Sequence, residues 1–395
     1  MSISSVAASK GLVGGPFGSS LVGNDYEVVG VPVIRGTNLG FGKYLGGSFV
    51  YVSEEKVARD LARNTAVPGD IVFTQRGTLG QVALVDDSAA DEYVVSQSQM
   101  RLRVDPEVAS TEFVYYACAA EAFFRQISDN AISTGVPHIN LGILGRLTIP
   151  LPGLVTQQSI AEVLGALDGK IATNTVLSNV TDEYLATVLD ALLCRGSADV
   201  PLATIANTNE LTRKPIAGES IRYVDIAAVG VGTHIVPGPI DWDNAPGRAR
   251  RALRRGDTLW STVRPNRRSH SLNLSSDRDL IGSTGLAVLT PTTVGFAYLY
   301  EITKRAEFTS YLETVAEGSA YPAVRADRFG EAQVPLLPEA QLTAFESLAA
   351  PMREHLYSLS QENIQLAATR DALLPQLMSG KLSVKDAEKS LAGVL

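Results

Sequence analysis

Two stretches of the chain carry apolar residues at the three- and four-residue spacing of an amphipathic helix. The first stretch contains Ile160, Leu164, Leu167 and Ile171 and then, less regularly, Leu177, Val180, Tyr184, Val188 and Leu192. The second contains Phe345, Leu348, Met352, Leu356, Leu359, Asn363, Leu366, Arg370, Leu373 and Leu377. Long stripes flanked by polar residues are typical of coiled-coil helices. We therefore predict two long helices that pair with each other, in preference to helices that each pack only on their own domain.

Proline and glycine residues interrupt or end these stretches. Pro351 lies inside the second stretch, where a proline costs roughly 3 kcal/mol, so we expect a kink or two consecutive helices there. Gly165 and Gly169 weaken the corresponding part of the first stretch. Gly196 and Pro201 indicate where the first helix ends.

The rest of the chain has a different pattern, with short runs of β-branched and aromatic residues between glycines and prolines. Examples are YEVVGVPVI, GDIVFT, SIRYVDIAAV and STGLAVLTP. Such runs are typical of strands. We predict β-rich mixed domains before each long helix.

The chain also repeats itself at a fixed interval. One constant shift along the chain, which we call the repeat shift, places Pro137 on Pro322, Ile139 on Val324, Leu144 on Phe329, Gly145 on Gly330 and Pro150 on Pro335. Apolar helix positions keep this register, and after a four-residue slip the sequence DALL at Asp190 meets DALL at Asp371. Upstream, Gly69-Asp70 corresponds to Gly256-Asp257. A period of this length indicates one structural unit written twice.

These patterns together predict an α+β fold with internal pseudo-twofold duplication. Two β-rich mixed domains are expected to be separated by two long helices that pack antiparallel. The predicted segments are a first domain at 1–150, a first helix at 151–196, a second domain at 197–336, a second helix at 337–380 and a tail at 381–395.

Composition limits the class of protein. The chain of 395 residues is 45% hydrophobic and 19% charged, which is typical of a globular protein. It has no apolar run near the roughly 20 residues of a membrane span and no leader pattern at its start, so we expect a cytoplasmic protein. Cys118 and Cys194 show no metal-binding spacing and are predicted to be buried thiols.

Positive charge is concentrated in one segment of a chain whose net charge is −8. Between Gly247 and His270 a single acid, Asp257, accompanies eight arginines: Arg248, Arg250, Arg251, Arg254, Arg255, Arg264, Arg267 and Arg268. Guanidinium groups suit phosphate oxygens and the O6/N7 edge of guanine. The alternative is a solvated loop, but self-pairing would need carboxylates from elsewhere in the chain. We therefore predict nucleic-acid contacts here.

The first copy is less basic, and its candidate contacts are correspondingly weaker. They are Arg35, Arg76, Arg101, Arg103 and the segment Ser96 to Gln99, in which Gln97 and Gln99 could read adenine. Catalytic or metal-binding patterns are missing: the four histidines are scattered, and the glycine spacing in GTNLGFGKY does not match a phosphate-binding loop. We expect no catalysis and no metal site in this chain.

Four segments together resemble one protein family. They are GPFGSSLVGNDYEVVGVPVIRGTNL, GDIVFTQRGTLGQVALV, STGVPHINLGILGRLTIPLP and RDALLPQLMSGKL, and they cover most of the chain in order. The chain resembles the specificity subunit of type I restriction-modification systems. One departure is the usual acidic residue and glutamine that open the helix. In the first copy, VTQQSIAEVL, the acid is missing, and either Gln157 or Gln158 keeps the glutamine.

The resemblance implies two target recognition domains that each read half of a bipartite DNA sequence. The helices, Thr156 to Leu193 and Glu339 to Leu377, would set the spacing and dock two methyltransferase subunits. Their implied spacer and docking positions are Leu164, Leu167, Ile171, Leu185, Val188, Leu192, Met352, Leu356, Leu359, Leu366, Leu373 and Leu377. S-adenosylmethionine, ATP and magnesium would belong to the methyltransferase subunits and to a possible motor-nuclease subunit.

Two other functions remain open. A degenerate relative could act as a protein-interaction scaffold without reading DNA, although the arginine segment argues against this. An enzyme is disfavoured by the missing catalytic patterns. Salt-dependent DNA binding distinguishes the first alternative, and DNA modification or cleavage by the purified chain would support the second.

Overall fold

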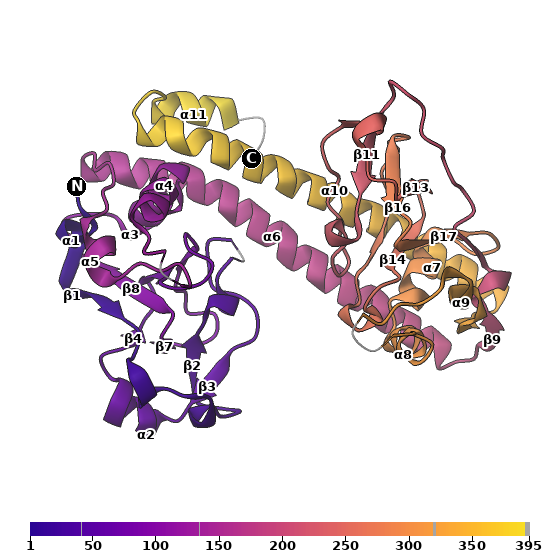
Figure 1. The fold of residues 1–395 in the computed structure, drawn as a ribbon, viewed down its shortest axis with the longest axis horizontal. Coiled ribbons are helices and arrows are strands. Elements are labelled where there is room, and N and C mark those ends of the chain that lie inside the picture. The colour runs from indigo at the N-terminus through magenta and orange to yellow at the C-terminus, as the bar shows by residue number, and fades with distance from the viewer. Residues whose placement is uncertain (41, 134, 319–320, 392–395) are drawn as a thin grey trace. The chain divides into compact units, whose positions relative to one another are not determined.

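The computed structural model describes residues 1–40, 42–133, 135–318 and 321–391, which form two compact units (Figure 1). Unit 1 comprises Met1–Thr173 and Glu362–Leu395, and unit 2 comprises Asn174–Gln361. The last four residues of the predicted tail lie outside the described residues. Two long helices, α6 (Leu154–Leu193) and α10 (Glu339–Met378), each contribute residues to both units.

Among its described residues, unit 1 has two four-stranded sheets. One has the order β1-β8-β5-β6, formed by Ala7–Gly14, Gln99–Val104, Ile71–Thr74 and Val82–Leu84, and its neighbours are antiparallel. The other has the order β3-β2-β7-β4, formed by Val50–Val52, Val31–Ile34, Tyr93–Val95 and Thr65–Ala66, and β2 and β7 are parallel. The helices are α1 (Ile3–Val6), α2 (Glu54–Lys56), α3 (Thr111–Ala119), α4 (Glu121–Asn130) and α5 (Leu141–Arg146), with short turns η1 (Gly18–Ser20), η2 (Gly23–Asp25), η3 (Gly36–Asn38) and η4 (Val57–Leu61).

Unit 2 repeats this arrangement in its described part. Its first sheet, β10-β17-β14-β15, comprises Ala206–Thr208, Leu286–Pro291, Thr258–Ser261 and His270–Leu272. Its second, β12-β11-β16-β13, comprises Ile240–Asp241, Ser220–Val224, Leu280–Ser283 and Ala249–Ala252. The helices are α7 (Phe296–Thr303), α8 (Ala306–Thr314) and α9 (Ala326–Glu331), with η5 (Leu202–Thr204), η6 (Ile226–Ala228), η7 (Trp242–Asn244) and η8 (Pro265–Arg267).

The predicted duplication is confirmed by this topology. Each strand in the two sheets of unit 1 has a counterpart at the same place in the sheets of unit 2, and the parallel pair of strands, β2 with β7, recurs as β11 with β16. The repeat shift found in the sequence carries both ends of α5 onto α9 and both ends of α6 onto α10. The α+β fold class with two long helices is therefore correct.

The beginning and the end of each domain lie side by side. In unit 1 the Met1 ammonium donates to the Ile149 carbonyl at 2.7 Å, and the Ile149 N–H donates back to Met1 at 2.9 Å. In unit 2 β9 (Ala198–Pro201) pairs antiparallel with β18 (Gln333–Leu336). Each β-rich domain is thus closed by its own first and last residues before the long helix begins.

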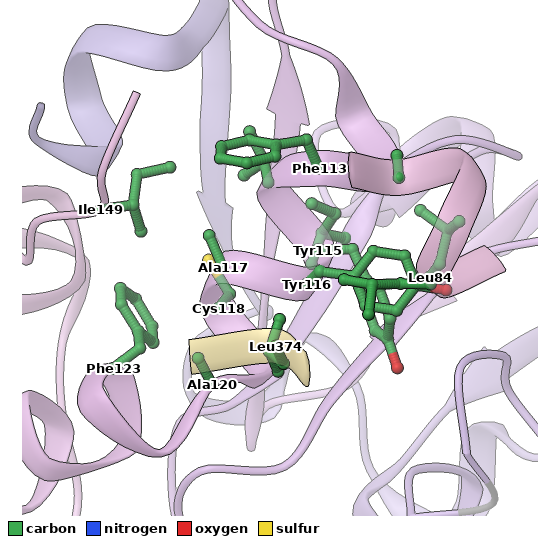
Figure 2. Close-up of a cluster of buried hydrophobic side chains, with 14 of the residues drawn as sticks. Leu84, Phe113, Tyr115, Tyr116, Ala117, Cys118, Ala120, Phe123, Ile149 and Leu374 are labelled. Atoms are coloured by element: carbon green, nitrogen blue, oxygen red, sulfur yellow. The ribbon is translucent and has the colours of Figure 1, made fainter. Parts of the chain in front are cut away.

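The core of unit 1 joins the β-rich domain to both long helices. Figure 2 shows Leu374 of α10 among buried side chains of the same core, which include Ala117 and Cys118 of α3. The final helix α11 (Val384–Leu391) lies alongside the C-terminal part of α10 and buries Ala387 and Leu391 in the same core (Figure 1). In unit 2 the buried aromatic residues include Trp260, Phe329 and Phe345.

A side chain from the long helix caps a shorter helix in each unit. In unit 1 Gln157, which is buried while Gln158 is exposed, accepts from the Ser110 N–H at 2.9 Å just before α3. In unit 2 Glu346 accepts from the N–H groups of Ala297 and Tyr298, at 3.1 and 2.9 Å, in the first turn of α7. These bonds satisfy amide groups that a helix start leaves unpaired and hold the domain against the long helix.

Three sequence-based expectations are corrected. Two consecutive helices at Pro351 are excluded, because α10 is continuous, while the alternative of a kink stays a prediction. Pro351 and Ser347 are both exposed, so water can reach the carbonyl that loses its partner. Cys118 is buried as expected, but Cys194 is exposed because it follows the last residue of α6.

The third correction concerns the apolar stripe of the first helix. Leu177, Val180 and Tyr184 are 42%, 58% and 47% exposed. The inward row instead passes through the polar residues Asn174 and Asp182 before it reaches Leu185 and Leu189. The inward face of α6 is therefore polar in its middle, and an apolar row on another face is exposed.

The long helices are antiparallel inside unit 1. Asp168 accepts from Arg370 at 2.6 Å, and the Lys170 ammonium lies 3.6 Å from Glu362. Residue numbers therefore increase along α6 in the direction in which they decrease along α10, so the two helices run in opposite directions. In unit 2, Asp182 of α6 accepts from Arg353 of α10 at 2.5 Å.

Candidate nucleic-acid interface

The arginine-rich segment of unit 2 is divided among several structural elements. It begins in β13, the strand at one end of a sheet, continues through the buried strand β14 and ends in the turn η8 and strand β15. Because β14 is buried, it separates the arginines before residue 256 from those after residue 263. The segment therefore presents separate groups of arginines.

Two of the arginines are paired with carboxylates from distant parts of the chain. The Arg254 guanidinium lies 2.8 Å from the Glu210 carboxylate. Arg255 binds Glu354 of α10 and the carbonyl of Leu274. The alternative of internal ion pairing thus applies to these two residues, which are the weakest candidates in the segment.

Three arginines lie on or beside β13 without a carboxylate partner among the residues that the structure describes. Arg248 is exposed, whereas Arg250 and Arg251 are half-buried. Arg250 donates to the Ala249 carbonyl at 2.7 Å. Burial lowers the pKa of Arg251, whose Nε lacks a hydrogen-bond partner within the described parts of the chain. Arg248 is the most accessible of the three.

The remaining three arginines surround η8. Arg267 is exposed, and its guanidinium has no partner in the described structure. Arg268 donates to the Lys304 carbonyl at 2.8 Å. Arg264 is half-buried and lies over the Tyr321 ring, with 4.6 Å between Cζ and the ring centroid. Tyr321 was not predicted from the sequence, although its 70% exposure is unusual for an aromatic side chain.

In unit 1 the structure brings two predicted residues together. Arg35 and Gln97 follow the parallel strands β2 and β7 and line a cavity of about 480 Å³, with Gly18, Leu21 and Tyr26. The Gln97 amide donates to the carbonyls of Gly18 and Leu21 at 2.7 and 2.9 Å. Gln97 therefore holds the neighbouring loop, while Arg35 faces the cavity half-buried.

The other candidates of unit 1 are placed apart from this cavity or inside the domain. Arg76 is exposed and forms an isolated bridge with His138. Gln99 is fully buried in β8, where it accepts from the Ser96 hydroxyl, so it has no access to a duplex in this conformation.

Arg101 and Arg103 bind the buried carboxylate of Asp70. Arg103 donates to Asp70 at 2.8 and 2.7 Å, and Arg101 approaches the same group at 3.5 Å. Burial of the Arg101 guanidinium lowers its pKa, even though the negative charge of Asp70 opposes this. These two arginines stabilise the sheet of unit 1. The recurring Gly-Asp pair was the sequence signal for the buried acid.

Unit 2 also has a cavity of about 770 Å³ beside its parts of α6 and α10. Its charged groups neutralise each other: Arg353 and Lys304 both contact Asp182 and Glu301. Burial, with the positive charges of Arg268 and Lys304 nearby, lowers the pKa of His270 to about 4, so this residue is neutral at pH 7. The cavity therefore has no strong net attraction for phosphate.

The predicted helix positions all face inward or are half-buried. Leu164, Leu167, Leu185, Leu359, Leu366, Leu373 and Leu377 are buried, and Ile171, Val188, Leu192, Met352 and Leu356 are half-buried. The exposed apolar residues on the unit 2 part of α6 are Val176, Leu177, Val180 and Tyr184. Because these four residues recur at helical spacing, they form one exposed row, which we call the α6 row.

The described residues contain neither a membrane-spanning helix nor a metal-binding cluster. No helix in ranges 1–40, 42–133, 135–318 and 321–391 combines the length and apolar character needed to cross a bilayer. Over the same ranges no three histidine, cysteine or carboxylate side chains gather as metal ligands would.

Comparison with known proteins finds similarity in sequence to type I specificity subunits and similarity in fold to one solved S subunit. A family model, the type I restriction modification DNA specificity domain, matches residues 22–181. The specificity subunit of the type I restriction enzyme HindI from Haemophilus influenzae is 28% identical over 154 residues, which cover 38% of this chain and 33% of that protein. The MjaIX specificity subunit from Methanocaldococcus jannaschii is 21% identical over 371 residues, 86% of this chain and 84% of that protein.

Among solved structures, the S subunit of a type I restriction-modification system from M. genitalium has a similar fold. Its TM-score is 0.57 at 17% identity, and the match covers 95% of both chains. The chain spans only about a third of the length of the first curated relatives that it matches, HindI and MjaVIII, the latter also from M. jannaschii.

Proposed function

Because the chain belongs to the family of type I restriction-modification specificity subunits, we propose that it reads a bipartite DNA target, one half-site with each unit. The observation that carries this proposal is the duplicated topology combined with different surfaces. The strands of the four-stranded sheets correspond one to one, and α3, α4, α5 and α6 correspond to α7, α8, α9 and α10. The surfaces differ: the candidates of unit 1 include Arg35 and Gln97, whereas unit 2 has the arginine-rich η8 loop. One scaffold with two different surfaces suits two different half-sites.

Within unit 2, the accessible arginines without carboxylate partners are the main candidates for DNA contacts. Arg267 and Arg248 are exposed, and a guanidinium that is free of an internal partner loses less on binding a phosphate than one that must first leave a carboxylate. Arg254 and Arg255 are the opposite case because Glu210 and Glu354 neutralise them.

The test compares two arginine substitutions of equal charge change. Arg267→Ala is expected to weaken binding of a duplex that the wild-type chain selects from a random pool, and to reduce the slope of log K against log[salt] by about one. Arg254→Ala is the matched control and should change both quantities less. The double variant Arg267→Ala/Arg268→Ala should weaken binding through the second half-site further. Equal binding by all variants would contradict the assignment, and absence of salt-dependent binding by the wild type would favour the scaffold function.

We further propose that methyltransferase subunits dock on the long helices and that the α6 row is part of this surface. The helix positions predicted from the sequence are occupied by packing inside the chain, but Val176, Leu177, Val180 and Tyr184 leave apolar area uncovered. Val180→Asp should reduce copurification with a methyltransferase subunit, while Asn179→Asp, on an exposed polar position of another face of the same helix, should not. Unchanged copurification of Val180→Asp would exclude the row from the interface.

In this proposal the chain itself carries out no chemistry. S-adenosylmethionine would bind the methyltransferase subunits, and ATP and magnesium would bind a motor-nuclease subunit if one is present. Since genomic DNA is the proposed ligand, we place the complex in the cytoplasm. Loss of N6-methyladenine at one split motif, when the gene is deleted, would establish the role and reveal both half-sites; unchanged methylation would count against it.

A further inference from the structure

Arg264 of unit 2 adopts a backbone conformation that residues with a side chain rarely adopt. Its φ is 52°, and it immediately precedes η8, where Pro265 fixes the start of the turn. The left-handed region is unfavourable for residues other than glycine, asparagine and aspartate because Cβ crowds the backbone. Such strain persists where surrounding structure imposes it, and it is concentrated at functional sites.

Unit 1 has a glycine at the equivalent position. The bridge between Val263 and Ala323 corresponds to the bridge between Arg76 and His138, which places Arg264 on Gly77, whose φ is 100°. The backbone bond is also equivalent: the Arg264 N–H donates to the Pro322 carbonyl at 2.7 Å, as the Gly77 N–H does to the Pro137 carbonyl at 3.4 Å. A glycine therefore satisfies the fold at this position, and the arginine of unit 2 is strained without benefit to the backbone.

The Arg264 side chain is held in place by Tyr321. The guanidinium lies over the ring at 4.6 Å, in a cation–π arrangement. Stacking uses the face of the guanidinium and leaves its N–H donors at the edge. No guanidinium nitrogen of Arg264 is buried without a partner, and no described residue accepts a hydrogen bond from it, so the edge faces water.

Tyr321 is exposed in a way that packing does not explain. It is 70% exposed, and the repeat shift places it on Val136, which is 57% exposed in unit 1. The pair Glu317 and Ala323, joined by two backbone bonds of 2.9 Å, fixes the chain close to Tyr321. Both units thus present an exposed apolar side chain at this position, and unit 2 adds an aromatic ring under an arginine.

We propose that Arg264 and Tyr321 form a preorganised DNA contact of unit 2, in which Arg264 binds the duplex and Tyr321 is a positioning residue. This inference rests on the proposed DNA-reading function. The ligand is a pair of hydrogen-bond acceptors on double-stranded DNA, either the O6 and N7 atoms of guanine or two phosphate oxygens, since both match the edge of a guanidinium. A stacked arginine has less freedom to lose on binding than a mobile one.

The first test separates strain from binding by comparing Arg264→Gly with Lys10→Gly. Lys10 of unit 1 also has a positive φ, 58°, and its carbonyl bond from Arg101 survives the substitution. Each variant removes one positive charge and one strained side chain. We expect both to melt at or above the wild-type temperature, and only Arg264→Gly to lose affinity, by about tenfold, for the duplex that the wild-type chain selects.

The second test addresses Tyr321. Tyr321→Phe keeps the ring and should bind DNA like the wild type, whereas Tyr321→Leu keeps apolar area without a ring and should lose part of the affinity lost in Arg264→Gly. In the double variant, Tyr321→Leu should add little to Arg264→Gly, because the ring acts through the arginine. A Tyr321→Leu chain that binds as tightly as the wild type would overturn the positioning role.

The outcomes also show whether Arg264 binds phosphate or guanine. They further distinguish failure of this inference from failure of the proposed DNA-reading function. A salt slope lowered by about one with unchanged sequence preference assigns phosphate, and lost discrimination at one G·C pair with an unchanged slope assigns guanine. If Arg264→Gly binds like the wild type, or melts earlier while it binds less, the inference is wrong although the wild type binds DNA. If the wild type itself does not bind in a salt-dependent manner, the proposed function fails first.

Discussion

The two units anchor the long helices with the same positions but opposite charges. In unit 1 the Tyr116 hydroxyl donates to Asp168 at 2.6 Å, and Arg370 donates to the other oxygen of that carboxylate at 2.6 Å. The repeat shift places Tyr116 on Glu301 and Asp168 on Arg353. In unit 2 Arg353 donates to Glu301 at 2.6 Å and to Asp182 at 2.5 Å.

The difference shows that the fold requires a satisfied polar group at this junction and not a particular charge. It also distinguishes the helices, since both acids, Asp168 and Asp182, lie on α6 and both arginines, Arg353 and Arg370, lie on α10. Buried ion pairs often contribute more to specific pairing than to stability. The charge distribution thus favours pairing of α6 with α10 over pairing of either helix with a second copy of itself.

The largest expected effect is the loss of Arg353. Arg353→Leu removes the ion pair between α10 and Asp182 of α6 and leaves Asp182 and Glu301, the latter 1% exposed, with Lys304 as their shared cationic partner. Breaking a buried ionic network in this way costs about 3–5 kcal/mol. Urea unfolding of the full chain should show the loss. Arg325→Leu, which breaks an exposed pair with Asp327, is the control and should change the unfolding free energy by less than about 1 kcal/mol.

A second comparison concerns the equivalent acids Asp70 and Asp257. Asp70→Asn leaves the buried Arg101 without its carboxylate and removes one of the two bonds from Arg103, because an amide nitrogen replaces one of the accepting oxygens. We expect a loss of about 2–3 kcal/mol, because a buried charge without a charged partner is costly. The measurement is the unfolding free energy at pH 7. An effect below that of the exposed Arg325→Leu change would show that the sheet does not depend on this network.

A smaller effect is expected at the unit 1 junction itself. Asp168→Asn keeps an oxygen that accepts from the Tyr116 hydroxyl, and Arg370 retains its contact with Asp371. The hydrogen bond from Arg370 is lost, because an amide nitrogen replaces the oxygen that accepts it, so the cost should be about 1–2 kcal/mol. If Asp168→Asn instead destabilised the chain as much as Arg353→Leu, the two junctions would be energetically equal despite their different burial.

The smallest effect at neutral pH is expected for Asp257→Asn. Burial raises the pKa of Asp257 even though Thr290 donates to it at 2.6 Å and the charge of Arg254 favours the ionised form. The Thr290 hydroxyl can turn to accept from an amide, so the unfolding free energy at pH 7 should change by less than about 0.5 kcal/mol.

The pH dependence gives a sharper version of this test. A carboxyl whose folded pKa is raised favours folding below its unfolded pKa, and this contribution is lost as pH rises through the folded pKa. The difference in unfolding free energy between Asp257→Asn and the wild type should therefore shift in favour of the variant as pH rises from about 3 to 7. A pH-independent difference would contradict the raised pKa.

We expect Asp182 to account for part of the decrease in the unfolding free energy of the wild type at acidic pH. Burial of this carboxyl opposes its ionisation, but the charges of Arg353 and Lys304 outweigh burial and lower its pKa. Its contribution is present above the unfolded pKa and is lost as pH falls through the folded value.

The sequence predicted the fold well where a repeated pattern was available. The repeat shift, found from Pro137 and Gly145, relates the ends of α6 to those of α10 in the structure. Sequence reasoning failed in the middle of α6, where hydrophobic periodicity followed Leu177 and Val180 while the inward row contains Asp182. An apolar stripe does not indicate which face is covered when ionic contacts, such as that of Asp182 with Arg353, occupy that face.

The candidate site was less predictable, because the type of a side chain does not indicate which residue it contacts in the folded chain. Arg255 binds Glu354, which is 99 residues away in the sequence, and Gln99 lies in a strand whose two faces are both covered. The stacking of Tyr321 on Arg264 depends on a tertiary contact between segments that are far apart in the sequence. Such placements follow from the fold and not from residue type.

The closure of each domain by its own ends has a consequence for protein engineering. Met1 bonds to Ile149 in unit 1, and β9 pairs with β18 in unit 2, so each domain enters and leaves at a single point next to its helix. A domain of different sequence could be inserted there if its two ends pair in the same way and it has a helix start that Gln157 of α6 or Glu346 of α10 can cap. The long helices would then be a constant scaffold that accepts different β-rich domains by grafting.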